Sequence, residues 1–567
     1  MECKDRILSN EYVDAIVDFP VESTINSTDD ICYINIDPDY YAVYANRNAI
    51  MSQPISTYQY QYIPKLYGLM APTSFDPSAL LESGILRLQN DPLNLKGRGV
   101  ILCFIDTGID YTNEVFRDAY GDTRILAIWD QTEGSGVPPE GYYYGSEYTR
   151  EDINRALSSD NPLGIVPSQD ENGHGSAMAG VAAGSRIGGG SVYVGAAPEA
   201  DIVVVKLKEC KPYLRNYYMI PEGVPAYEET DIMLAVKYVE SFAITFFRPV
   251  VICLGLGTNM GDHNGNSFLA QYLNEVGARR SRCVVVCGGN EGNAAHHFAA
   301  RLSLGNGGQN NYRDVEIRVG EGERGFQMEF WGSIPDTFNV AIRSPGGETV
   351  PPMRLGIDQV SNYSFIYERT RITIQSVLVD PGSGEQLILF RISAPTPGVW
   401  NFRISAVGEV HNGTFHMWLP ITEFLSSTTY FLQPDPDTTL TEPSMASGVI
   451  CVSTYNDVNN SFYLESGRGY SRGGAVRPDF CAPGVNVSTI FGRGTGSSLA
   501  AAITAGGVAQ FMQWAVVERN SRLVQTEEIR NYFIKGANRS PDVTYPNREW
   551  GYGRLNVQGV FNALAGV

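Results

Sequence analysis

The stretch Gly494-Thr495-Gly496-Ser497-Ser498-Leu499-Ala500-Ala501-Ala502-Ile503-Thr504-Ala505-Gly506 places two serines where a glycine turn enters a run of small apolar residues. The run shows no polar stripe until about Gln510, which predicts a helix buried on all sides. Unpaired N–H groups at the start of such a helix attract developing negative charge. A serine hydroxyl placed there becomes a useful nucleophile only if a base takes its proton and donors hold an oxyanion. The remainder of the chain must therefore supply both.

Composition limits the kinds of protein that this chain can be. At 567 residues it exceeds the roughly 250–300 residues of a single core, so we expect two or three domains. Hydrophobic residues make up 43% and charged residues 18%, which is typical of a globular protein. The 42 basic and 62 acidic residues give a net charge of −20. That charge argues against nucleic acid or an anionic membrane as the partner.

The N-terminal segment, the apolar stretches and the cysteines together predict a location inside the cell. We expect no membrane span, because no stretch of about 20 apolar residues stands out. The N-terminus has no hydrophobic segment, so we expect no signal peptide and an intracellular protein. The nine cysteines are odd in number and include no CxxC pair. They predict buried free thiols and argue against a disulfide framework or a zinc site.

Continuous apolar runs predict parallel strands that are covered on both faces. The clearest runs are 100–106, 201–206, 249–254 and 283–287. Predicted helices alternate with them, and this order is typical of a doubly wound α/β sheet. Asp106 ends the first run and Asn290 follows the last, at the strand ends where catalytic groups of such sheets gather. His174 opens a helix of small residues; alone, each of these three side chains is more often structural.

Two further regions differ from this α/β pattern. Residues 1–70 predict a small α+β unit with strands near 12–19, 31–36 and 41–44, followed by an extended apolar tail, Ile63–Met70. Between about residues 302 and 434 the sequence shows no helical pattern. Seven short strand-like runs, separated by Gly, Pro and Asn, predict a β-sandwich or jelly roll. The runs are 314–319, 325–331, 337–342, 371–379, 386–392, 399–407 and 414–419. We interpret this region as a stabilising or packing module; a ligand-binding role stays open, but nothing in the sequence singles out a site.

Short motifs around the polar residues match those of a known family. Asp106-Thr-Gly-Ile-Asp110, Asn172-Gly-His174-Gly-Ser, Gly288-Gly-Asn290-Glu-Gly and Gly496-Ser497-Ser498-Leu-Ala resemble the aspartate, histidine, asparagine and serine boxes of subtilisin-like serine proteases. Their order along the chain is also that of subtilisin. Further similar signatures are Ala196-Ala-Pro198, Arg477-Pro-Asp479 with Ala482-Pro483-Gly484, and Gly551-Tyr-Gly553-Arg554. The resemblance covers about residues 95–301 and 440–560.

The resemblance implies a role for each of these residues. Ser498 is expected to be the nucleophile, His174 the base and Asp106 the group that orients His174. The side-chain amide of Asn290 would share the oxyanion with the Ser498 backbone N–H. Strand 253–257 is expected to pair with substrate, with Cys253, Leu254 and Gly255 as substrate-binding residues.

Three residues depart from the family pattern. Ser497 replaces the usual threonine, Ala502 replaces a proline, and Cys253 stands where subtilisins usually have serine. Ser497 remains an alternative nucleophile, although the spacing to Gly506 favours Ser498.

The whole layout is similar to that of the clostridial Csp germination proteases. The resemblance implies a prodomain (1–70), a catalytic domain in two parts (71–301 and 436–567) and a jelly-roll insertion (302–435). The prodomain would assist folding, be cut autocatalytically between about Leu66 and Pro72, and stay bound non-covalently as an inhibitor. The implied protein substrate is a zymogen of a spore cortex hydrolase, with packaging in the spore. Two alternatives stay open: a catalytically quiet signalling or scaffold protein, since some members have lost triad residues, and a general intracellular subtilase.

We expect no cofactor. Subtilases often bind calcium, but the sequence contains no convincing loop of spaced carboxylates, so no calcium site is identified.

Overall fold

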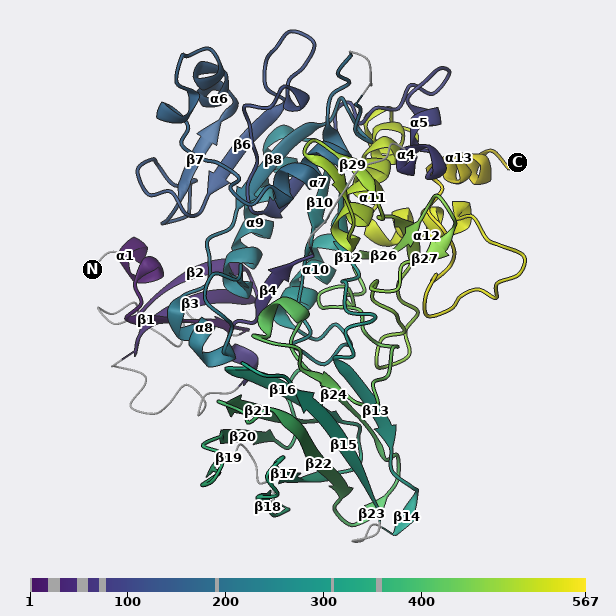
Figure 1. The fold of residues 1–567 in the computed structure, drawn as a ribbon. Coiled ribbons are helices and arrows are strands. Elements are labelled where there is room, and N and C mark those ends of the chain that lie inside the picture. The colour runs from purple at the N-terminus through teal and green to yellow at the C-terminus, as the bar shows by residue number, and fades with distance from the viewer. Residues whose placement is uncertain are drawn as a thin grey trace.

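A computed structural model describes residues 3–18, 31–47, 60–70, 78–188, 193–306, 311–352 and 359–566. Its centre is a nine-stranded sheet in the order β27-β26-β12-β10-β5-β8-β6-β7, with β28 beside β26 (Figure 1). The strands are β5 (Ile101–Asp106), β6 (Ile125–Asp130), β7 (Ser146–Thr149), β8 (Asp201–Lys206), β10 (Val250–Leu254), β12 (Arg282–Cys287), β26 (Ile450–Asn456), β27 (Ser461–Phe462) and β28 (Phe480–Pro483). All pairs are parallel except β6–β7 and β26–β27. The predicted parallel α/β sheet is confirmed.

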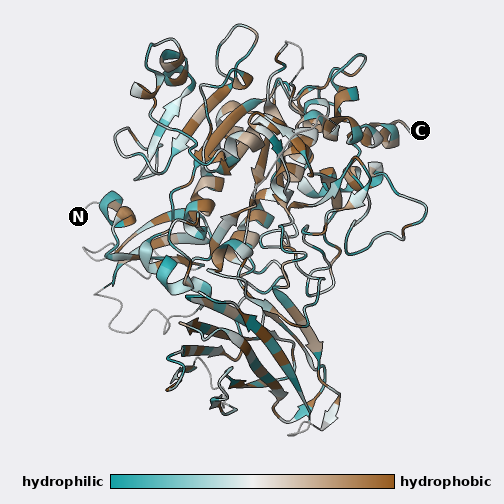
Figure 2. Cartoon of the chain, in the orientation of Figure 1, coloured by the Kyte–Doolittle hydropathy of each residue, from teal (hydrophilic) through white to brown (hydrophobic). Residues whose placement is uncertain are grey.

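Helices cover both faces of this sheet, which explains why its strands are apolar throughout. On β5, Leu102 and Phe104 pack with the helices α7 (His174–Ala183) and α11 (Ser497–Met512). The alternate residues of β5 pack on the other face with α9 (Glu229–Phe246) and α10 (Phe268–Ala278). Successive side chains of a strand point to opposite faces, so a strand covered on both needs apolar residues at every position. Figure 2 shows these strands as mostly hydrophobic.

The helix α11 is buried at every residue, as its sequence predicted. A π-helical turn, Gln513–Val517, continues it. Within the described part of the chain, Ser497–Val517 is one helix long and apolar enough to cross a membrane. This corrects the expectation that no such stretch exists. Its most apolar window is 83% buried inside the protein, because α11 packs between the central sheet and neighbouring helices such as α7.

The N-terminal part carries the helix α1 (Cys3–Leu8) and the strands β1 (Tyr12–Val17), β2 (Ile31–Asp37) and β3 (Tyr40–Asn46). They form an antiparallel sheet in the order β1-β3-β2, which packs on α9. A disulfide joins Cys3 to Cys32, whereas we expected only free thiols. The pair is 29 residues apart in sequence, and only the packing of α1 beside β2 brings it together. The other seven cysteines are buried thiols.

The insertion, His297–Phe431, consists mainly of two antiparallel sheets, ordered β13-β24-β16-β21-β20-β19 and β18-β17-β22-β15-β25 (Figure 1). Their inner faces share one apolar core. Each of the seven predicted runs contains a strand. The strands are β13 (His297–Arg301), β15 (Tyr312–Val319), β16 (Gly325–Gly332), β17 (Phe338–Arg343), β18 (Thr349–Val350), β19 (Gln359–Ser364), β20 (Arg371–Val377), β21 (Gln386–Ser393), β22 (Gly398–Ala406), β24 (Thr414–Trp418) and β25 (Tyr430–Phe431).

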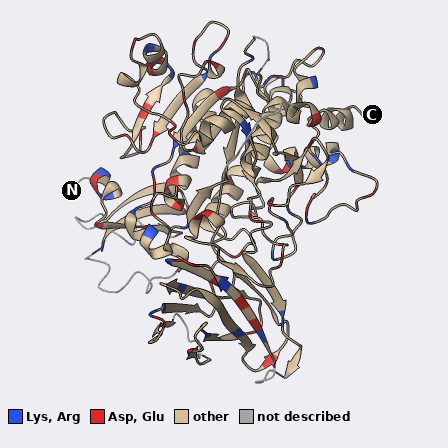
Figure 3. Cartoon of the chain, viewed as in Figure 1, with Lys and Arg blue, Asp and Glu red and all other residues tan. Residues whose placement is uncertain are grey.

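The remaining elements are short or peripheral. They are β4 (Leu66–Leu69), β9 (Tyr227–Glu228), β11 (Leu256–Gly257), β14 (Gly305–Asn306), β23 (Glu409–Val410), β29 (Val487–Thr489), β30 (Gly492–Gly494), α4 (Ala79–Glu82), α5 (Ile85–Leu88), α6 (Arg150–Leu157), α8 (Pro212–Tyr218), α12 (Thr526–Gly536), α13 (Val557–Ala565) and the 3₁₀ turns η2 (Tyr60–Tyr62), η3 (Glu114–Phe116), η4 (Pro162–Gly164) and η5 (Thr422–Phe424). Charged residues of both signs are spread over all three parts of the molecule (Figure 3).

A buried carboxyl group joins the three parts. Glu329, on β16 of the insertion, accepts hydrogen bonds from the hydroxyl of Tyr60 and from the backbone N–H of Gly261, the latter at 2.9 Å. Tyr60 precedes the tail, and Gly261 follows β11. Burial raises the pKa of Glu329 to about 7. The insertion is therefore in direct polar contact with both other parts.

Candidate active site

Three polar side chains from distant elements form one hydrogen-bonded line. His174, the first residue of α7, places Nδ1 2.7 Å from Oδ1 of Asp106 at the end of β5. Its Nε2 lies 3.1 Å from Oγ of Ser498 at the start of α11. All three residues are buried. The geometry brings together the aspartate, histidine and serine that the sequence singled out, at distances that allow proton transfer from the hydroxyl to the imidazole.

Asp170 holds the start of α7 in place, a role that sequence reasoning did not assign. Its Oδ1 accepts from the Gly173 N–H at 2.8 Å and from the Thr107 hydroxyl at 2.7 Å. Its Oδ2 accepts from the N–H and the hydroxyl of Ser176 at 2.8 and 2.6 Å. Asp170 thus binds N–H groups that a helix start leaves unpaired and links them to the residue after Asp106. The position of Asp170 shortly before a histidine at a predicted helix start is the sequence feature that could have indicated this role.

Glycines allow the elements around His174 to approach closely. A side chain on Gly175 would place its Cβ 2.3 Å from the Gly108 carbonyl oxygen, which follows β5. A Cβ on Gly255 would lie 2.4 Å from the sulfur of Met178 and 3.1 Å from Cε1 of His174. Real Cβ atoms do not come so near, so a side chain on Gly175 would displace backbone, and one on Gly255 would displace the end of the Met178 side chain and crowd His174. These contacts fix the height of the imidazole above the end of the sheet.

The electrostatic surroundings of His174 favour its protonated form. Burial by itself would lower the pKa of His174, but the nearby carboxylate of Asp106, with help from Asp170, outweighs burial. The pKa of His174 is therefore raised above its usual value of 6.5. An imidazole that gains a proton readily while held against a hydroxyl can act as a general base.

Asn290 lies where the serine helix begins. It follows β12, and its side-chain oxygen accepts a hydrogen bond from the Ser497 N–H at 3.0 Å. This bond turns the carbonyl oxygen of the Asn290 side chain toward the start of α11. The hydroxyl of Ser497, by contrast, is buried and has no hydrogen-bond partner among the described residues.

The tail occupies the site as an extended strand. Its strand β4 pairs antiparallel with β11 on one side and with β9 on the other; we call the space between β11 and β9 the groove. Beyond β4, the Met70 N–H donates to the Gly255 carbonyl at 3.3 Å. The carbonyl oxygen of Met70 accepts from the Ser498 hydroxyl at 2.7 Å. One backbone carbonyl of the chain itself therefore lies against the serine, and the residues after it, 71–77, lie outside the described part.

The three predicted substrate-binding residues take different positions. Gly255 contacts the tail through its carbonyl group. Cys253 and Leu254 lie on β10 inside the central sheet, both buried. The chain leaves the sheet after Leu254, so the strand that contacts the tail begins two residues later, with Leu256 and Gly257.

A cavity of about 460 Å³ opens beside His174, lined among others by Asp170, Ala177, Phe491 and Arg493. The sequence did not predict this cavity, because Phe491 lies in the turn and Arg493 on the second strand of a short hairpin, β29–β30, that carries no sequence signal of function. Within the described part of the chain, no group of three or more His, Cys, Asp or Glu side chains is arranged to hold a metal ion.

Comparisons with known proteins relate the chain to a family of peptidases. The model of the subtilase family of peptidases matches residues 97–315 and 422–553. The structure of the CspB protease of Clostridium perfringens is 30% identical over 86% of this chain and 98% of its own, with a TM-score of 0.75. The maturation proteases PagA, for prenylagaramide, and PatA, for patellamide, are 12% identical over 85% and 83% of this chain and 99% and 98% of theirs, with TM-scores of 0.37 and 0.38. A search of curated proteins gave no match.

The match to the family model skips most of the insertion and includes the ends of β5, β10 and β12 and the starts of α7 and α11. These are the segments that carry Asp106, His174, Asn290 and Ser498. The chain belongs to the subtilase family and is a serine-type, subtilisin-like peptidase.

Proposed function

We propose that the chain is an endopeptidase that first cuts itself after Met70 and then processes another protein. The observation that carries this proposal is the position of the Ser498 hydroxyl, which lies between the base His174 and the carbonyl group of Met70. A nucleophile, its base and an extended peptide are thereby held together, as peptide-bond hydrolysis requires.

The reaction can be followed atom by atom. The Ser498 oxygen attacks the carbonyl carbon of Met70, and the proton of its hydroxyl passes to Nε2 of His174. The negative charge that forms on the carbonyl oxygen is held by the Ser498 N–H and the Asn290 amide. The bond between Met70 and Ala71 then breaks, and His174 gives its proton to the leaving amine. Water, activated by the same imidazole, releases Met70 from the serine.

The parts of the chain take the corresponding roles. Residues 1–70 act as a prodomain that assists folding and inhibits the enzyme, and 71–301 with 436–567 form the catalytic domain. Residues 302–435 form the inserted jelly roll. The similarity to a clostridial CspB protease supports a role in spore germination, with a cortex-hydrolase zymogen as the protein substrate and packaging in the spore. We assign no cofactor and no calcium.

The proposal is tested on the purified full chain. We expect N-terminal sequencing to find Ala71 as a new terminus and a fluorophosphonate probe to label Ser498 once the prodomain is displaced. An intact chain without labelling would instead support a catalytically quiet signalling or scaffold protein. Broad digestion of casein, without preference for a single precursor, would support a general intracellular subtilase.

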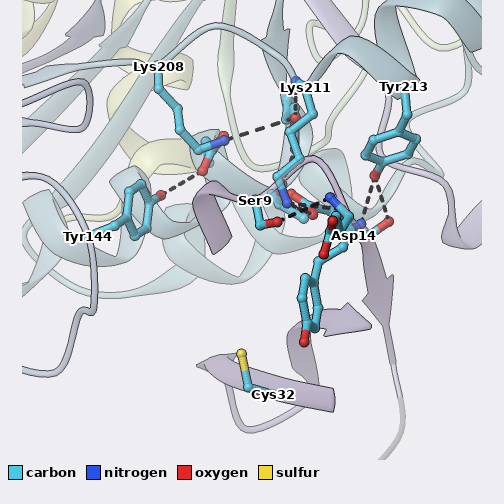
Figure 4. A network of polar contacts seen from close by, with 12 residues as sticks. Ser9, Asp14, Cys32, Tyr144, Lys208, Lys211 and Tyr213 are labelled. Atoms are coloured by element: carbon cyan, nitrogen blue, oxygen red, sulfur yellow. Dashed lines mark hydrogen bonds and ion pairs between the residues drawn. The ribbon is translucent and has the colours of Figure 1, made fainter. Parts of the chain in front are cut away.

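A buried cluster of charges ties the prodomain to the catalytic domain (Figure 4). Asp14, on β1, forms an ion pair with Lys211, whose backbone N–H donates to Glu228 at 2.6 Å. Lys208 completes the cluster by pairing with Asp231 at 2.5 Å. All five side chains are at most 9% exposed. The cluster holds three carboxylates and two ammonium groups, so its full ionisation would bury one net negative charge.

Release of the cleaved prodomain is expected to depend on pH through Asp14. Burial, only partly offset by Lys211, raises the pKa of Asp14 well above its usual range. In the released prodomain the pKa of Asp14 is ordinary, so binding takes up a proton. The affinity should therefore fall as the pH rises above about 4 toward the raised pKa, by up to about one log unit of Kd per pH unit. Size-exclusion chromatography of the processed enzyme at a series of pH values from 4 to 9 measures the retained fraction.

Two variants distinguish the titration of Asp14 from a general weakening of prodomain binding at high pH. Asp14→Asn keeps a neutral side chain at this place and should remove the dependence on pH. Glu11→Gln changes an exposed carboxyl group beside the same strand and should retain it. Equal retention of the wild-type prodomain over the whole range from pH 4 to pH 9 would contradict the assignment to Asp14.

A further inference from the structure

The middle of the tail carries a glycine, Gly68, although the backbone conformation at this position does not require one. Gly68 lies on β4, opposite Gly257 of β11. It is not among the described glycines with a left-handed backbone, so its conformation is open to any residue. Glycine weakens a strand and often marks a place where another group comes close. The reason for Gly68 must therefore be sought in the space around it.

That space is filled by the end of the insertion. A Cβ on Gly68 would lie 2.5 Å from Cδ1 of Ile421 and 3.3 Å from Cε1 of Phe424. Ile421 is 0% and Phe424 1% exposed. Both pack in the same apolar cluster as Leu66 and Met70 of the tail. We call Ile421 and Phe424 the cover; a methyl group at residue 68 would require the end of the Ile421 side chain to turn away and would press on the ring of Phe424.

The cover is held firmly in place. The N–H and the hydroxyl of Thr422 donate to Oε1 of Glu291 at 3.1 and 2.9 Å. Oε2 of Glu291 lies 2.6 Å from Nδ1 of His296, and the Glu291 side chain is buried. Glu291 directly follows Asn290, so the cover is attached to the wall of the active site. Moving it away from the groove would cost the buried carboxyl group of Glu291 its two hydrogen bonds from Thr422.

The neighbours of Gly68 meet a different environment. Side chains alternate along a strand, so Tyr67 and Leu69 point away from the cover. They are 0% and 7% exposed and pack with Leu256 in the second apolar cluster of the protein. The groove accordingly accepts large apolar side chains on one face of the bound strand and is closely packed on the other face at the level of residue 68, so a side chain there is disfavoured.

We propose that the insertion sets the substrate preference of this peptidase. The cover favours an extended segment whose third residue, counted back from and including the residue at the cut, is a glycine; this is the position of Gly68 relative to Met70. The residues on either side of that glycine are large and apolar. This inference rests on the proposed function and gives the insertion a part in choosing substrates.

The test uses self-cleavage of the full chain, followed by mass spectrometry after expression and during refolding. Gly68→Ala should slow the cut after Met70 about 10- to 100-fold, because overpacking a filled site is costly. Adding Ile421→Ala to Gly68→Ala removes the atom that the new methyl group would strike and should restore most of the rate. Gly134→Ala, at a glycine with no atom within 4 Å of an added Cβ, is the matched control and should cleave as the wild type does.

The outcomes separate this inference from the proposed function. A wild-type chain that is never cut after Met70 would overturn both. A wild type that is cut, with Gly68→Ala cut equally fast, would overturn the glycine preference and leave the endopeptidase in place. A slow Gly68→Ala that Ile421→Ala does not rescue would show that the cover is not the cause. Thermal unfolding of each variant in the Ser498→Ala background, where no cut occurs, reports whether a slow variant is folded.

Discussion

Replacing Ser498 by alanine is expected to stop self-cleavage, so that the purified chain has the mass of all 567 residues. The change removes the oxygen that lies 2.7 Å from the Met70 carbonyl oxygen and 3.1 Å from the imidazole. Loss of the corresponding serine in subtilisin lowers kcat by about 2 × 10⁶. This magnitude is taken over from that related enzyme. Intact mass spectrometry of wild type and variant, prepared in parallel, measures the effect.

Ser497→Ala is the matched control for this experiment. Its hydroxyl is one residue away, is buried, and has no hydrogen-bond partner among the described residues, so its loss should slow cleavage by less than about tenfold, far below the change of a reacting group. The reverse result, with Ser498→Ala cut normally and Ser497→Ala intact, would assign the nucleophile to Ser497. Equal intact mass of wild type and both variants would contradict self-cleavage altogether.

The second large effect is expected from Asp106→Asn, which should slow cleavage about 10⁴-fold. Oδ1 of Asp106 accepts from Nδ1 of His174 and from the Thr107 N–H at 2.7 and 2.8 Å. An asparagine amide in its place can donate to Nδ1, which moves the proton of the ring to Nε2. The imidazole would then present an N–H to Ser498 and could not take its proton.

The same variant should change the pH dependence. Only neutral His174 can act as the base, so cleavage declines as the pH falls through the pKa of His174. Because Asp106 raises that pKa, the wild type should lose activity at a pH above 6.5, the usual value. In Asp106→Asn the residual activity should persist to lower pH. Rates of self-cleavage during refolding at a series of pH values measure the decline toward low pH in the wild type and in the variant.

Asp110→Asn provides the control for a lost carboxylate on the same loop. Its side chain accepts only from the N–H and hydroxyl of Thr112 among the described residues, and it does not touch His174. The rate of cleavage, and the pH at which it declines on the acid side, should both stay as in the wild type. A comparable loss in Asp106→Asn and Asp110→Asn would mean that the loop as a whole, and not the contact with His174, matters.

Much of the fold could be predicted because burial leaves a direct record in the sequence. The strand β5 is apolar at five successive positions, since helices cover both of its faces, and it ends on Asp106. The helix α11 carries no polar stripe because every side of it is buried. The meeting of Asp106, His174 and Ser498 at one edge of the sheet was predicted from the resemblance of the motifs around them, and of their order, to those of subtilisin-like proteases.

Contacts between distant segments left no such record. Asp170 looked like a loop residue, and only the folded chain shows that it binds the start of α7. The strand beside the tail was expected to include Cys253, but the chain turns out of the sheet after Leu254, and a pattern of apolar residues does not reveal such a bend. The disulfide between Cys3 and Cys32 likewise depends on which elements are neighbours in space.

The tail and the groove that holds it belong to one chain, and this determines the kinetic order of maturation. No encounter between molecules is needed before the cut, since covalent connection already supplies a high local concentration of the reacting group. The half-time of maturation should therefore be unchanged over roughly a hundredfold dilution, as in any unimolecular process. A cell that makes this protein would time its maturation by how fast each single copy folds, and not by how many copies have accumulated.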